Sequence, residues 1–309
     1  MNGFSSSPGP KEAPETGPTT NDRTVLLGLL GENIAQSLTP VMHENEAKRQ
    51  GIPLVYRIID PCLMGIAEPD WPALVEQAIS FGFNGLNVTH PAKQSVIPAL
   101  DELDEDATLL GAVNTIVVEE GRLIGRNTDH SGFTTALEAI HVDASAGEVI
   151  QIGAGGAGSA IAYALLSAGV PKLSIADINP ASSRALIGRL SAAFDNSRMR
   201  AIAPDQISHA ARGAVGLVNS TPIGMTGVSN ASPFPVDALH CGMWVGDAVY
   251  RPLHTTLVKA AADVGCAVFG GAHMAVGQAA AAFTMFTGAY SDRESMLESF
   301  ELSAAHSAK

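Results

Sequence analysis

Four polar residues in the first half of the chain have side chains that could hold a substrate and move a proton. Ser37 and Thr39 stand together in QSLTP. Lys93 ends the run NVTHPAK, and Asp129 stands in GRNTDHSGF. A lysine or an aspartate can donate or accept a proton, and hydroxyl groups can hydrogen-bond a substrate. These are the polar groups that the oxidation of an alcohol requires beside a nucleotide cofactor.

Each of these residues also has a purely structural interpretation. Ser-Leu-Thr-Pro is typical of a helix start in which Thr39 is the N-cap and Pro40 is the first helical residue. Asp129 could cap a helix in the same way, and Lys93 could be a solvated lysine in a first helical turn. The residues alone leave both interpretations open.

A glycine-rich motif in the second half of the chain predicts a dinucleotide site. GAGGAG satisfies G-x-G-x-x-G, follows the apolar run VIQI and opens a helical pattern. Such glycines allow a tight turn and close approach to a pyrophosphate, and the helix start supplies free N–H groups. A glycine turn without a ligand is the alternative. The expected loop residues are Gly153, Ala154, Gly155, Gly156, Ala157 and Gly158.

An acidic residue after the next strand-like run favours NAD over NADP. Asp177 ends KLSIAD, at the distance from the glycines where an acid hydrogen-bonds the adenine ribose. Its carboxylate would repel the extra phosphate of NADP, and the following residue is the apolar Ile178. Arg184 stands a few residues on and could still turn toward the ribose.

The hydrophobic pattern predicts two series of strands and helices that would position these residues. In the first, strands are expected at 24–30, 54–59 and 85–89, helices at 40–50, 72–80 and from Pro91, and a hairpin at Glu120-Gly121. In the second, strands are expected at 148–153, 172–177, 214–220, 243–249 and 266–271, and helices at 157–169, 181–194, 253–264 and from His273. Alternating strands and helices predict parallel sheets, and therefore an α/β fold with two lobes.

Composition excludes several classes of partner. The 309 residues hold 18 Lys and Arg against 31 Asp and Glu, a net charge of −13 that disfavours a nucleic acid or a membrane surface. The three cysteines form no C-x-x-C pair, which fits a reducing compartment, and we expect a cytoplasmic protein. The nine histidines show no metal-ligating spacing, so no metal is expected. Residues 1–23 are expected to be a disordered tail.

Eight sequence blocks, in this order, closely resemble the shikimate dehydrogenase family. They are Ser-x-Thr at 37–39, NVTHPAK at 87–93, GAVNTI at 111–116, NTDHSGF at 127–133, GAGGAG at 153–158, NSTPIGM at 219–225, GDAVYRP at 246–252 and GGAHMAVGQAAAAF at 270–283. The resemblance extends from about Leu26 to Gly288. It implies a substrate-binding catalytic domain at 24–128, a Rossmann domain at 129–270, and C-terminal helices at 271–309 that return to the first domain.

The resemblance also implies a role for each matching residue. Lys93 and Asp129 correspond to the family's catalytic pair, and Ser37 and Thr39 to the residues that hold the substrate carboxylate. The positions that bind ring hydroxyls or line the substrate pocket are Thr89, Asn114, Gln278 and Tyr250. The positions that join the glycine loop on the cofactor side are Thr221, Gly271 and Met274, the last two near the nicotinamide.

Two departures from the usual biosynthetic pattern favour one branch of the family. Biosynthetic members usually carry serine where this chain has Thr39, and basic residues after the strand that here ends in Asp177. The combination resembles the NAD-dependent quinate/shikimate dehydrogenases, which oxidise a ring secondary hydroxyl to give 3-dehydroquinate or 3-dehydroshikimate. An NADP-dependent biosynthetic shikimate dehydrogenase and a non-catalytic dinucleotide sensor are the alternatives. A homodimer stays open as an alternative to a monomer.

Overall fold

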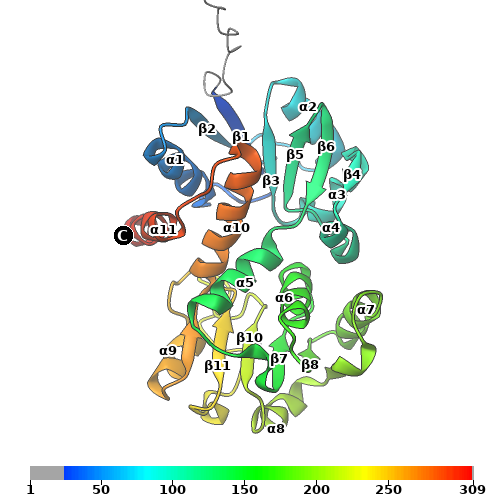
Figure 1. Cartoon of the computed structure of the whole chain (residues 1–309), viewed down its shortest axis with the longest axis vertical. Helices are drawn as coiled ribbons and strands as arrows, with labels where there is room; N and C mark the ends of the chain where they lie inside the picture. Colours follow the sequence, from blue (N-terminus) through cyan, green and yellow to red (C-terminus); the bar gives the residue numbers. More distant parts are fainter. Residues whose placement is uncertain (1–23, 308–309) are drawn as a thin grey trace, which may run out of the picture.

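The computed structural model describes residues 24–307, which form two α/β lobes lying one above the other in Figure 1. Within these residues, each lobe contains one sheet of six strands. The expected two-lobed α/β architecture is confirmed. The predicted tail at 1–23 lies outside the described residues.

The sheet of the first lobe has the strand order β2-β1-β3-β5-β6-β4. Its strands are β1 (Val25–Leu30), β2 (Leu54–Ile59), β3 (Gly85–Val88), β4 (Glu102–Leu103), β5 (Thr115–Glu119) and β6 (Arg122–Arg126). β1 pairs in parallel with β2 and β3, but β5 is antiparallel to β3 and β6. The hairpin predicted at Glu120-Gly121 is confirmed, and it adds an antiparallel pair to a sheet in which β1, β2 and β3 are parallel as predicted.

Short helices cover the first sheet. They are α1 (Thr39–Arg49), α2 (Trp71–Ser80), α3 (Ala92–Ser95) and α4 (Glu105–Leu110), with a 3-10 turn at Ile97–Ala99. Helix α2 begins where the Asp70 side chain accepts a hydrogen bond from the backbone of Ala73. It buries Leu74 and Val75 in the same core as Leu86 of β3, so α2 and β3 are packed together in one hydrophobic core.

The sheet of the second lobe is parallel throughout, with the order β12-β11-β10-β7-β8-β9. Its strands are β7 (Glu148–Ile152), β8 (Lys172–Ala176), β9 (Met199–Ile202), β10 (Gly216–Asn219), β11 (Trp244–Asp247) and β12 (Ala267–Phe269). Strand order reverses between β7 and β10, the place where parallel α/β sheets bind ligands outside the carboxyl ends of their strands.

Helices lie on both faces of the second sheet. They are α5 (Asp129–Ala139), α6 (Gly156–Ser167), α7 (Pro180–Leu190), α8 (Ile207–Ala211) and α9 (Thr256–Asp263), with 3-10 turns at Ala144–Ala146, Asn196–Arg198, Pro204–Gln206 and Val236–Ala238. One core joins α5, α6 and α7 to the sheet, and a second joins α8 and α9 to its other face. Two buried faces explain the continuous apolar runs of these strands.

Helices α5 and α10 (Gly271–Thr287) connect the lobes, and they lie side by side in Figure 1. A Cβ on Gly132 would lie 2.5 Å from the carbonyl oxygen of Met274, and a Cβ on Gly277 would lie 2.8 Å from the Cα of Gly132. The two helices can approach this closely only because both positions are glycine. Helix α11 (Arg293–Ser307) packs on α1 and α10. The domain boundaries at 128/129 and 270/271 stay a prediction.

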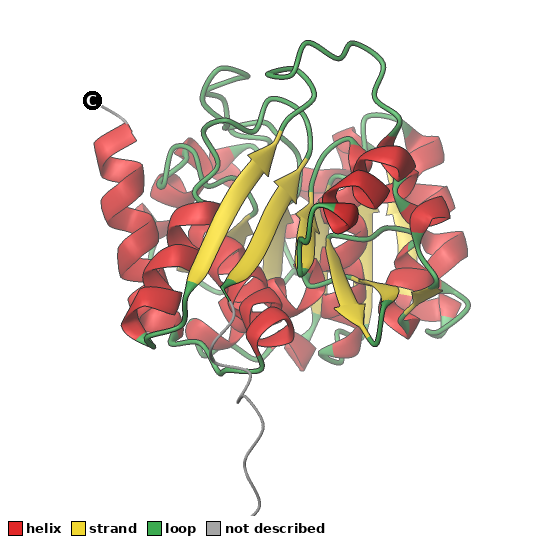
Figure 2. Ribbon diagram, turned by 90° about the horizontal axis from the view of Figure 1, so that it is seen from above, coloured by secondary structure: helices red, strands yellow, loops and turns green. Residues whose placement is uncertain are grey.

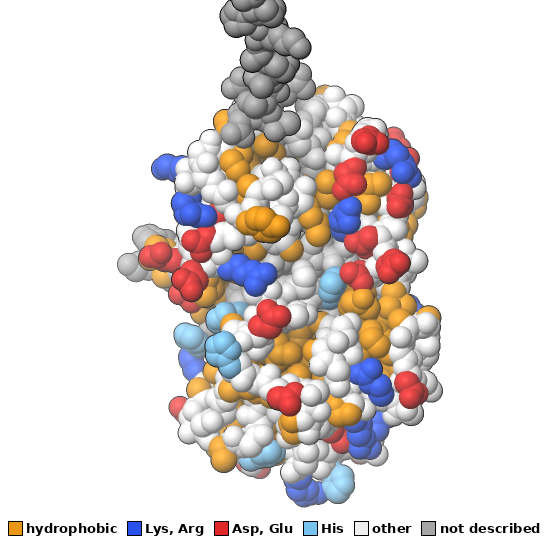
Figure 3. Space-filling view, in the orientation of Figure 1, with side chains coloured by type: hydrophobic (Ala, Val, Ile, Leu, Met, Phe, Trp, Pro, Cys, Tyr) orange, Lys and Arg blue, Asp and Glu red, His pale blue; other side chains and the backbone are white. Residues whose placement is uncertain are grey.

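Figure 2 looks down on the first lobe and shows its strands flanked by helices. On the face drawn in Figure 3, Lys and Arg side chains are scattered over both lobes, several of them beside acidic ones. Among residues 24–307, no helix combines the length and the apolar character that crossing a membrane requires.

Candidate active site

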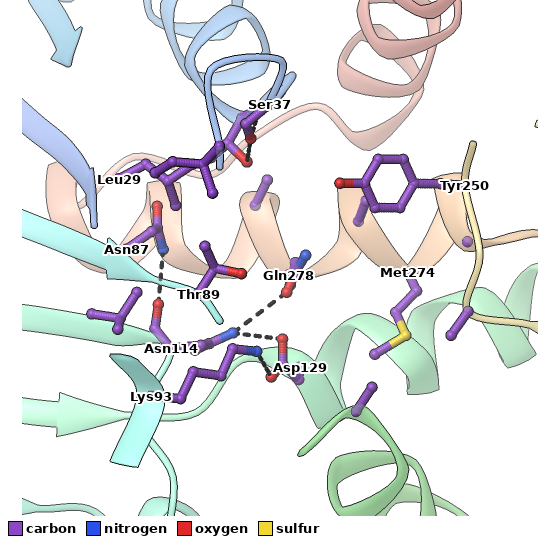
Figure 4. A pocket seen from close by; sticks show the side chains of 18 of the residues that line it. Leu29, Ser37, Asn87, Thr89, Lys93, Asn114, Asp129, Tyr250, Met274 and Gln278 are labelled. Atoms are coloured by element: carbon purple, nitrogen blue, oxygen red, sulfur yellow. Dashed lines mark hydrogen bonds and ion pairs between the residues drawn. The ribbon is translucent and has the colours of Figure 1, made fainter. Parts of the chain in front are cut away.

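A cavity of about 320 Å³ opens between the two lobes. The first lobe contributes most of its polar groups, and the second lobe and α10 close the opposite side. Of the residues predicted for the site, the cavity brings together Ser37, Thr39, Thr89, Lys93, Asn114, Asp129, Ala157, Tyr250, Gly271, Met274 and Gln278. In Figure 4 the labelled side chains of Lys93 from α3, Asp129 from the start of α5, and Gln278 from α10 point toward one another.

The Lys93 ammonium nitrogen lies 2.5 Å from Oδ2 of Asp129. Asp129 is buried, and the Lys93 side chain is only 23% exposed. Asp129 is the first residue of α5, and its carboxylate is held by Lys93 and by the Asn114 amide at 2.9 Å. The capping interpretation of Asp129 and the solvated-lysine interpretation of Lys93 are therefore wrong. The two side chains form an ion pair that lines the cavity.

Asn114 fixes the orientation of that carboxylate. Its Oδ1 accepts a hydrogen bond from the Thr128 backbone at 2.7 Å, which turns its Nδ2 toward Asp129 and toward Gln278 Oε1 at 3.4 Å. The Gln278 side chain reaches this point from α10 (Figure 4). The Asn114 amide therefore links the Lys93–Asp129 ion pair to α10, one of the two helices that connect the lobes.

Sequence reasoning missed Asn87, which lies on β3 and lines the cavity. Its Oδ1 accepts a hydrogen bond of 2.7 Å from the buried Tyr56 hydroxyl, and its Nδ2 donates to Thr115 Oγ1 at 3.2 Å. Burial raises the pKa of Tyr56 well above its ordinary value, so the phenol stays a donor. The signal was present, since an asparagine inside the strand run GLNV needs polar partners.

The two hydroxyls of QSLTP face the cavity from the loop that enters α1. Ser37 Oγ lies 3.2 Å from Thr39 Oγ1 and accepts a hydrogen bond from the Thr39 backbone at 3.3 Å. Leu38 is the N-cap, Thr39 is the first helical residue, and no side chain caps this helix. The prediction that Thr39 caps α1 is therefore wrong, and its hydroxyl is available to a ligand.

Tyr250 and Met274 close the cavity from the opposite side (Figure 4). Tyr250 follows β11, and its ring meets that of Phe300 in α11 edge to face, with centroids 5.8 Å apart. Met274 stands in the first turns of α10, where it is buried. Their elements belong to different parts of the chain, so only the folded molecule brings them together.

The glycine loop lies at the carboxyl end of β7, beside the place where the strand order reverses. Gly153 has a φ of +105°, and a Cβ on Gly158 would lie 2.5 Å from the Gly153 carbonyl oxygen. Both positions therefore require glycine. A Cβ on Gly155 would instead meet nothing within 4 Å. Helix α6 begins at Gly156 with no side-chain cap, so its first N–H groups face an open cradle that suits a pyrophosphate.

Asp177 is hydrogen-bonded to this loop, whereas Arg184 is not. The Asp177 carboxylate accepts hydrogen bonds of 2.8 Å from the backbone N–H groups of Ala154 and Asn179. Arg184 is exposed on α7, and within residues 24–307 it forms no hydrogen bond or ion pair. The remaining predicted residue, Thr221, follows β10 and donates its hydroxyl to Asn219 Oδ1 at 2.7 Å. Its methyl carbon lies 2.9 Å from the Cβ position of Gly153, directly beside the loop.

Comparison with known proteins identifies the family of this chain. Residues 29–116 match the model of the shikimate dehydrogenase substrate binding domain. The quinate/shikimate dehydrogenase (NAD(+)) of Corynebacterium efficiens is 44% identical over 281 residues, which span 91% of this chain and 99% of that protein. The chain belongs to the shikimate dehydrogenase family. The resemblance inferred from the eight sequence blocks is thereby confirmed.

Members of both branches of the shikimate dehydrogenase family are similar to this chain. The shikimate dehydrogenase (NADP(+)) of Pseudarthrobacter chlorophenolicus is 46% identical over 281 residues, covering 91% of this chain and 96% of that one. Quinate dehydrogenase from Corynebacterium glutamicum, solved in complex with NAD, superposes with a TM-score of 0.86 at 42% identity, covering 90% of this chain and 99% of that chain. Family membership therefore does not by itself choose between the cofactors.

Proposed function

We propose that this protein is an NAD-dependent dehydrogenase that oxidises the ring secondary hydroxyl of quinate and shikimate, giving 3-dehydroquinate and 3-dehydroshikimate. The observation that carries the proposal is the Lys93–Asp129 ion pair, 2.5 Å long, inside a cavity that adjoins a dinucleotide loop. The relatives named above act on these substrates or carry their names.

The second lobe has the features that a nicotinamide dinucleotide needs. The cradle around Gly155 and the uncapped start of α6 suit its pyrophosphate, and Asp177 suits the hydroxyls of its adenine ribose. Gly271 and Met274 line the cavity where α10 begins and would flank the nicotinamide end. Bound there, the cofactor would accept a hydride from the substrate carbon.

Lys93 and Asp129 handle the proton of the reacting hydroxyl. The hydroxyl must lose its proton as the carbon loses its hydride, so a base has to lie within hydrogen-bond reach of that oxygen. Lys93 accepts this proton as a neutral amine, and Asp129, which is itself oriented by Asn114, then holds the ammonium that forms. The ring hydroxyls that do not react would bind Thr89, Asn114 and Gln278, which line the same cavity.

The carboxylate of the substrate would bind the hydroxyls of Ser37 and Thr39. These lie 3.2 Å apart, close enough for one carboxylate to accept from both. Quinate carries its carboxylate on a saturated carbon, so the group leaves the ring at a different angle from that of shikimate. The extra methyl group of Thr39 changes the shape of this clamp and supports acceptance of both acids.

Asp177 supports NAD over NADP, because its carboxylate would repel a phosphate on the adjacent ribose. The NADP-dependent shikimate dehydrogenase stays the second candidate, since a relative of that name is 46% identical. The intact Lys93–Asp129 pair favours an enzyme over a dinucleotide sensor, which has no use for it. A homodimer and a cytoplasmic location stay predictions.

The decisive experiment measures initial rates with quinate and shikimate, each with NAD and with NADP, at neutral and alkaline pH. We expect turnover of both acids and a higher kcat/KM with NAD. Faster turnover with NADP would support the biosynthetic alternative. Dinucleotide binding without turnover of either acid would support the sensor and contradict the proposal.

A further inference from the structure

The mouth of the cavity carries one cation to which the proposed reaction gives no role. Among the described residues that line the cavity, the charged ones are Lys93, Asp129 and Arg251. Lys93 and Asp129 pair with each other, whereas Arg251 forms no ion pair within residues 24–307. We propose that Arg251 is a specificity residue whose guanidinium binds the substrate carboxylate together with Ser37 and Thr39. This inference rests on the proposed function, because it presupposes a carboxylate substrate.

The loop that carries Arg251 is fixed to the second lobe. It leaves β11 at Asp247, a fully buried residue whose carboxylate accepts hydrogen bonds from the Val249 backbone at 3.0 Å and from Thr255 Oγ1 at 2.6 Å. The carbonyl oxygen of Arg251 accepts a further bond of 2.7 Å from the Thr226 backbone. One buried side chain thus ties both ends of the loop, so the position of Arg251 follows that of the second lobe.

The loop that carries Ser37 is fixed to the first lobe in the same manner. Asp60 is buried at the end of β2, and its carboxylate accepts hydrogen bonds from the backbones of Ile34 at 2.9 Å and Cys62 at 3.0 Å. The Ser37 backbone then donates to the Ile34 carbonyl oxygen at 2.9 Å. The position of the Ser37 hydroxyl therefore follows that of the first lobe.

A single hydrogen bond joins these two loops across the cavity mouth. Nη2 of Arg251 donates to the carbonyl oxygen of Gln36, the residue directly before Ser37. The guanidinium therefore contacts the residue that precedes Ser37, the first of the two residues whose hydroxyls form the proposed carboxylate clamp. Because the two residues belong to different lobes, this juxtaposition exists only when the lobes are as close as they are in this structure.

The guanidinium keeps enough donors for a carboxylate. It has five N–H groups, and within the described residues its only hydrogen bond is the one from Nη2 to Gln36. A carboxylate can accept two parallel bonds from the remaining donors. Ser37 and Thr39 are neutral, and the whole chain has a charge of −13, so a carboxylate that leaves water for this cavity needs a local cation. Arg251 supplies that charge from the lobe opposite the hydroxyls.

The proposal has a consequence for the motion of the lobes. A carboxylate bound by Ser37 on one lobe and Arg251 on the other would link them more strongly than the bond to Gln36 alone. Recognition of the acid and closure of the cavity would then be the same event. A substrate analogue without the negative charge would gain nothing from Arg251.

The test compares the wild-type protein with Arg251→Met, which removes the charge but keeps much of the side-chain length, and with Arg251→Lys, which restores a charge. Arg57→Met is the matched control, because Arg57 is exposed on β2 and the substitution changes the net charge equally. For each protein, kcat/KM is measured for the acid at low and high ionic strength. The methyl ester of the same acid is then assayed as a substrate, or as a competitive inhibitor if it is not turned over.

We expect Arg251→Met to lower kcat/KM for the acid about 10- to 100-fold, mainly through KM, and to leave the ester and the KM for the dinucleotide unchanged. Arg251→Lys should recover part of the loss, and the salt dependence of the wild type and of Arg57→Met should be absent from Arg251→Met. Equal losses for acid and ester, or no loss for the acid, would overturn the proposal. A wild-type protein that oxidises neither acid would instead contradict the proposed function.

Discussion

The Asp177 carboxylate accepts a hydrogen bond of 2.8 Å from the backbone N–H of Ala154, and so joins the end of β8 to the glycine loop. The acid that we propose selects the cofactor is thereby held at the loop that would bind the cofactor's phosphates. Replacing Asp177 would remove a negative charge beside the expected position of the ribose. It would also remove the hydrogen bond that supports the loop.

Asp177→Ala should therefore lower kcat/KM for NAD about 10- to 100-fold, because one charge-assisted hydrogen bond to the ribose is lost. The ratio of NADP to NAD turnover should rise, since the repulsion of the extra phosphate is removed. Arg57→Ala is the control, because Arg57 is exposed on β2 in the other lobe. Unchanged kinetic constants of Asp177→Ala for both cofactors would contradict the assignment.

Two glycines of the loop should respond differently to the same substitution. A Cβ on Gly158 would lie 2.5 Å from the Gly153 carbonyl oxygen, so Gly158→Ala should lower the free energy of unfolding by about 1–3 kcal/mol. A Cβ on Gly155 would enter open space, and the backbone there is extended, so Gly155→Ala should change that free energy by less than about 0.5 kcal/mol. Its Cβ should nevertheless obstruct the pyrophosphate. Denaturant unfolding together with titration of the dinucleotide separates the two effects, and normal dinucleotide affinity of Gly155→Ala would argue against the cradle.

Thr39→Ser tests the shape of the carboxylate clamp. Thr39 does not cap α1, so the substitution removes one methyl group from the cavity without removing a helix cap. We expect the ratio of quinate to shikimate kcat/KM to fall about 3- to 10-fold, the effect of roughly 1 kcal/mol in the fit of one substrate. Steady-state rates with both acids measure this ratio, and a ratio equal to that of the wild type would count against the role of the methyl group.

His43 should make the stability of the protein depend on pH. It is fully buried on α1, both ring nitrogens lack hydrogen-bond partners within residues 24–307, and its ring packs against that of Tyr56 with centroids 5.0 Å apart. Burial lowers the pKa of His43 from 6.5 to about 3. Between these values the unfolded chain binds a proton that the folded chain does not. Its contribution to the free energy of unfolding is therefore complete above pH 6.5 and falls on acidification by about 1.4 kcal/mol per pH unit.

Urea unfolding between about pH 7 and pH 4 measures this slope. His43→Leu should flatten it relative to the wild type, because the leucine has no proton to bind, while other groups titrate equally in both proteins. His254→Gln is the matched control, since His254 is exposed and its removal should leave the slope unchanged. Equal slopes for His43→Leu and the wild type would show that His43 does not titrate in this way.

Much of the fold follows from patterns that are local in the sequence. The apolar runs after Glu148 and Lys172 are strands because both of their faces are buried, and the turn at Glu120-Gly121 reverses the chain within two residues. Apart from α5, which has eleven residues, the elements that the sequence analysis missed are short. Strand β4 has two residues and α8 has five, so neither is long enough to show a period.

The candidate site also has parts that could be predicted from the sequence and parts that could not. The Lys93–Asp129 pair and the glycine loop carry motifs that can be interpreted residue by residue. Whether Asp129 caps a helix or binds a lysine depends on where Lys93 and Asn114 lie, 36 and 15 residues away. Arg251 escaped notice because its neighbour Gln36 is 215 residues distant, and only the packing of the two lobes brings them together.

We propose that the Lys93–Asp129 pair moves the proton of an alcohol whose hydride leaves to a nicotinamide dinucleotide. The most direct test is the steady-state rate of NADH formation from quinate or shikimate by the wild-type protein and by Lys93→Ala. We predict that kcat falls about 10²- to 10⁴-fold in the variant, with a much smaller change in KM, because Lys93 acts on the reacting hydroxyl. A folded Lys93→Ala protein that keeps a nearly normal kcat would contradict the account.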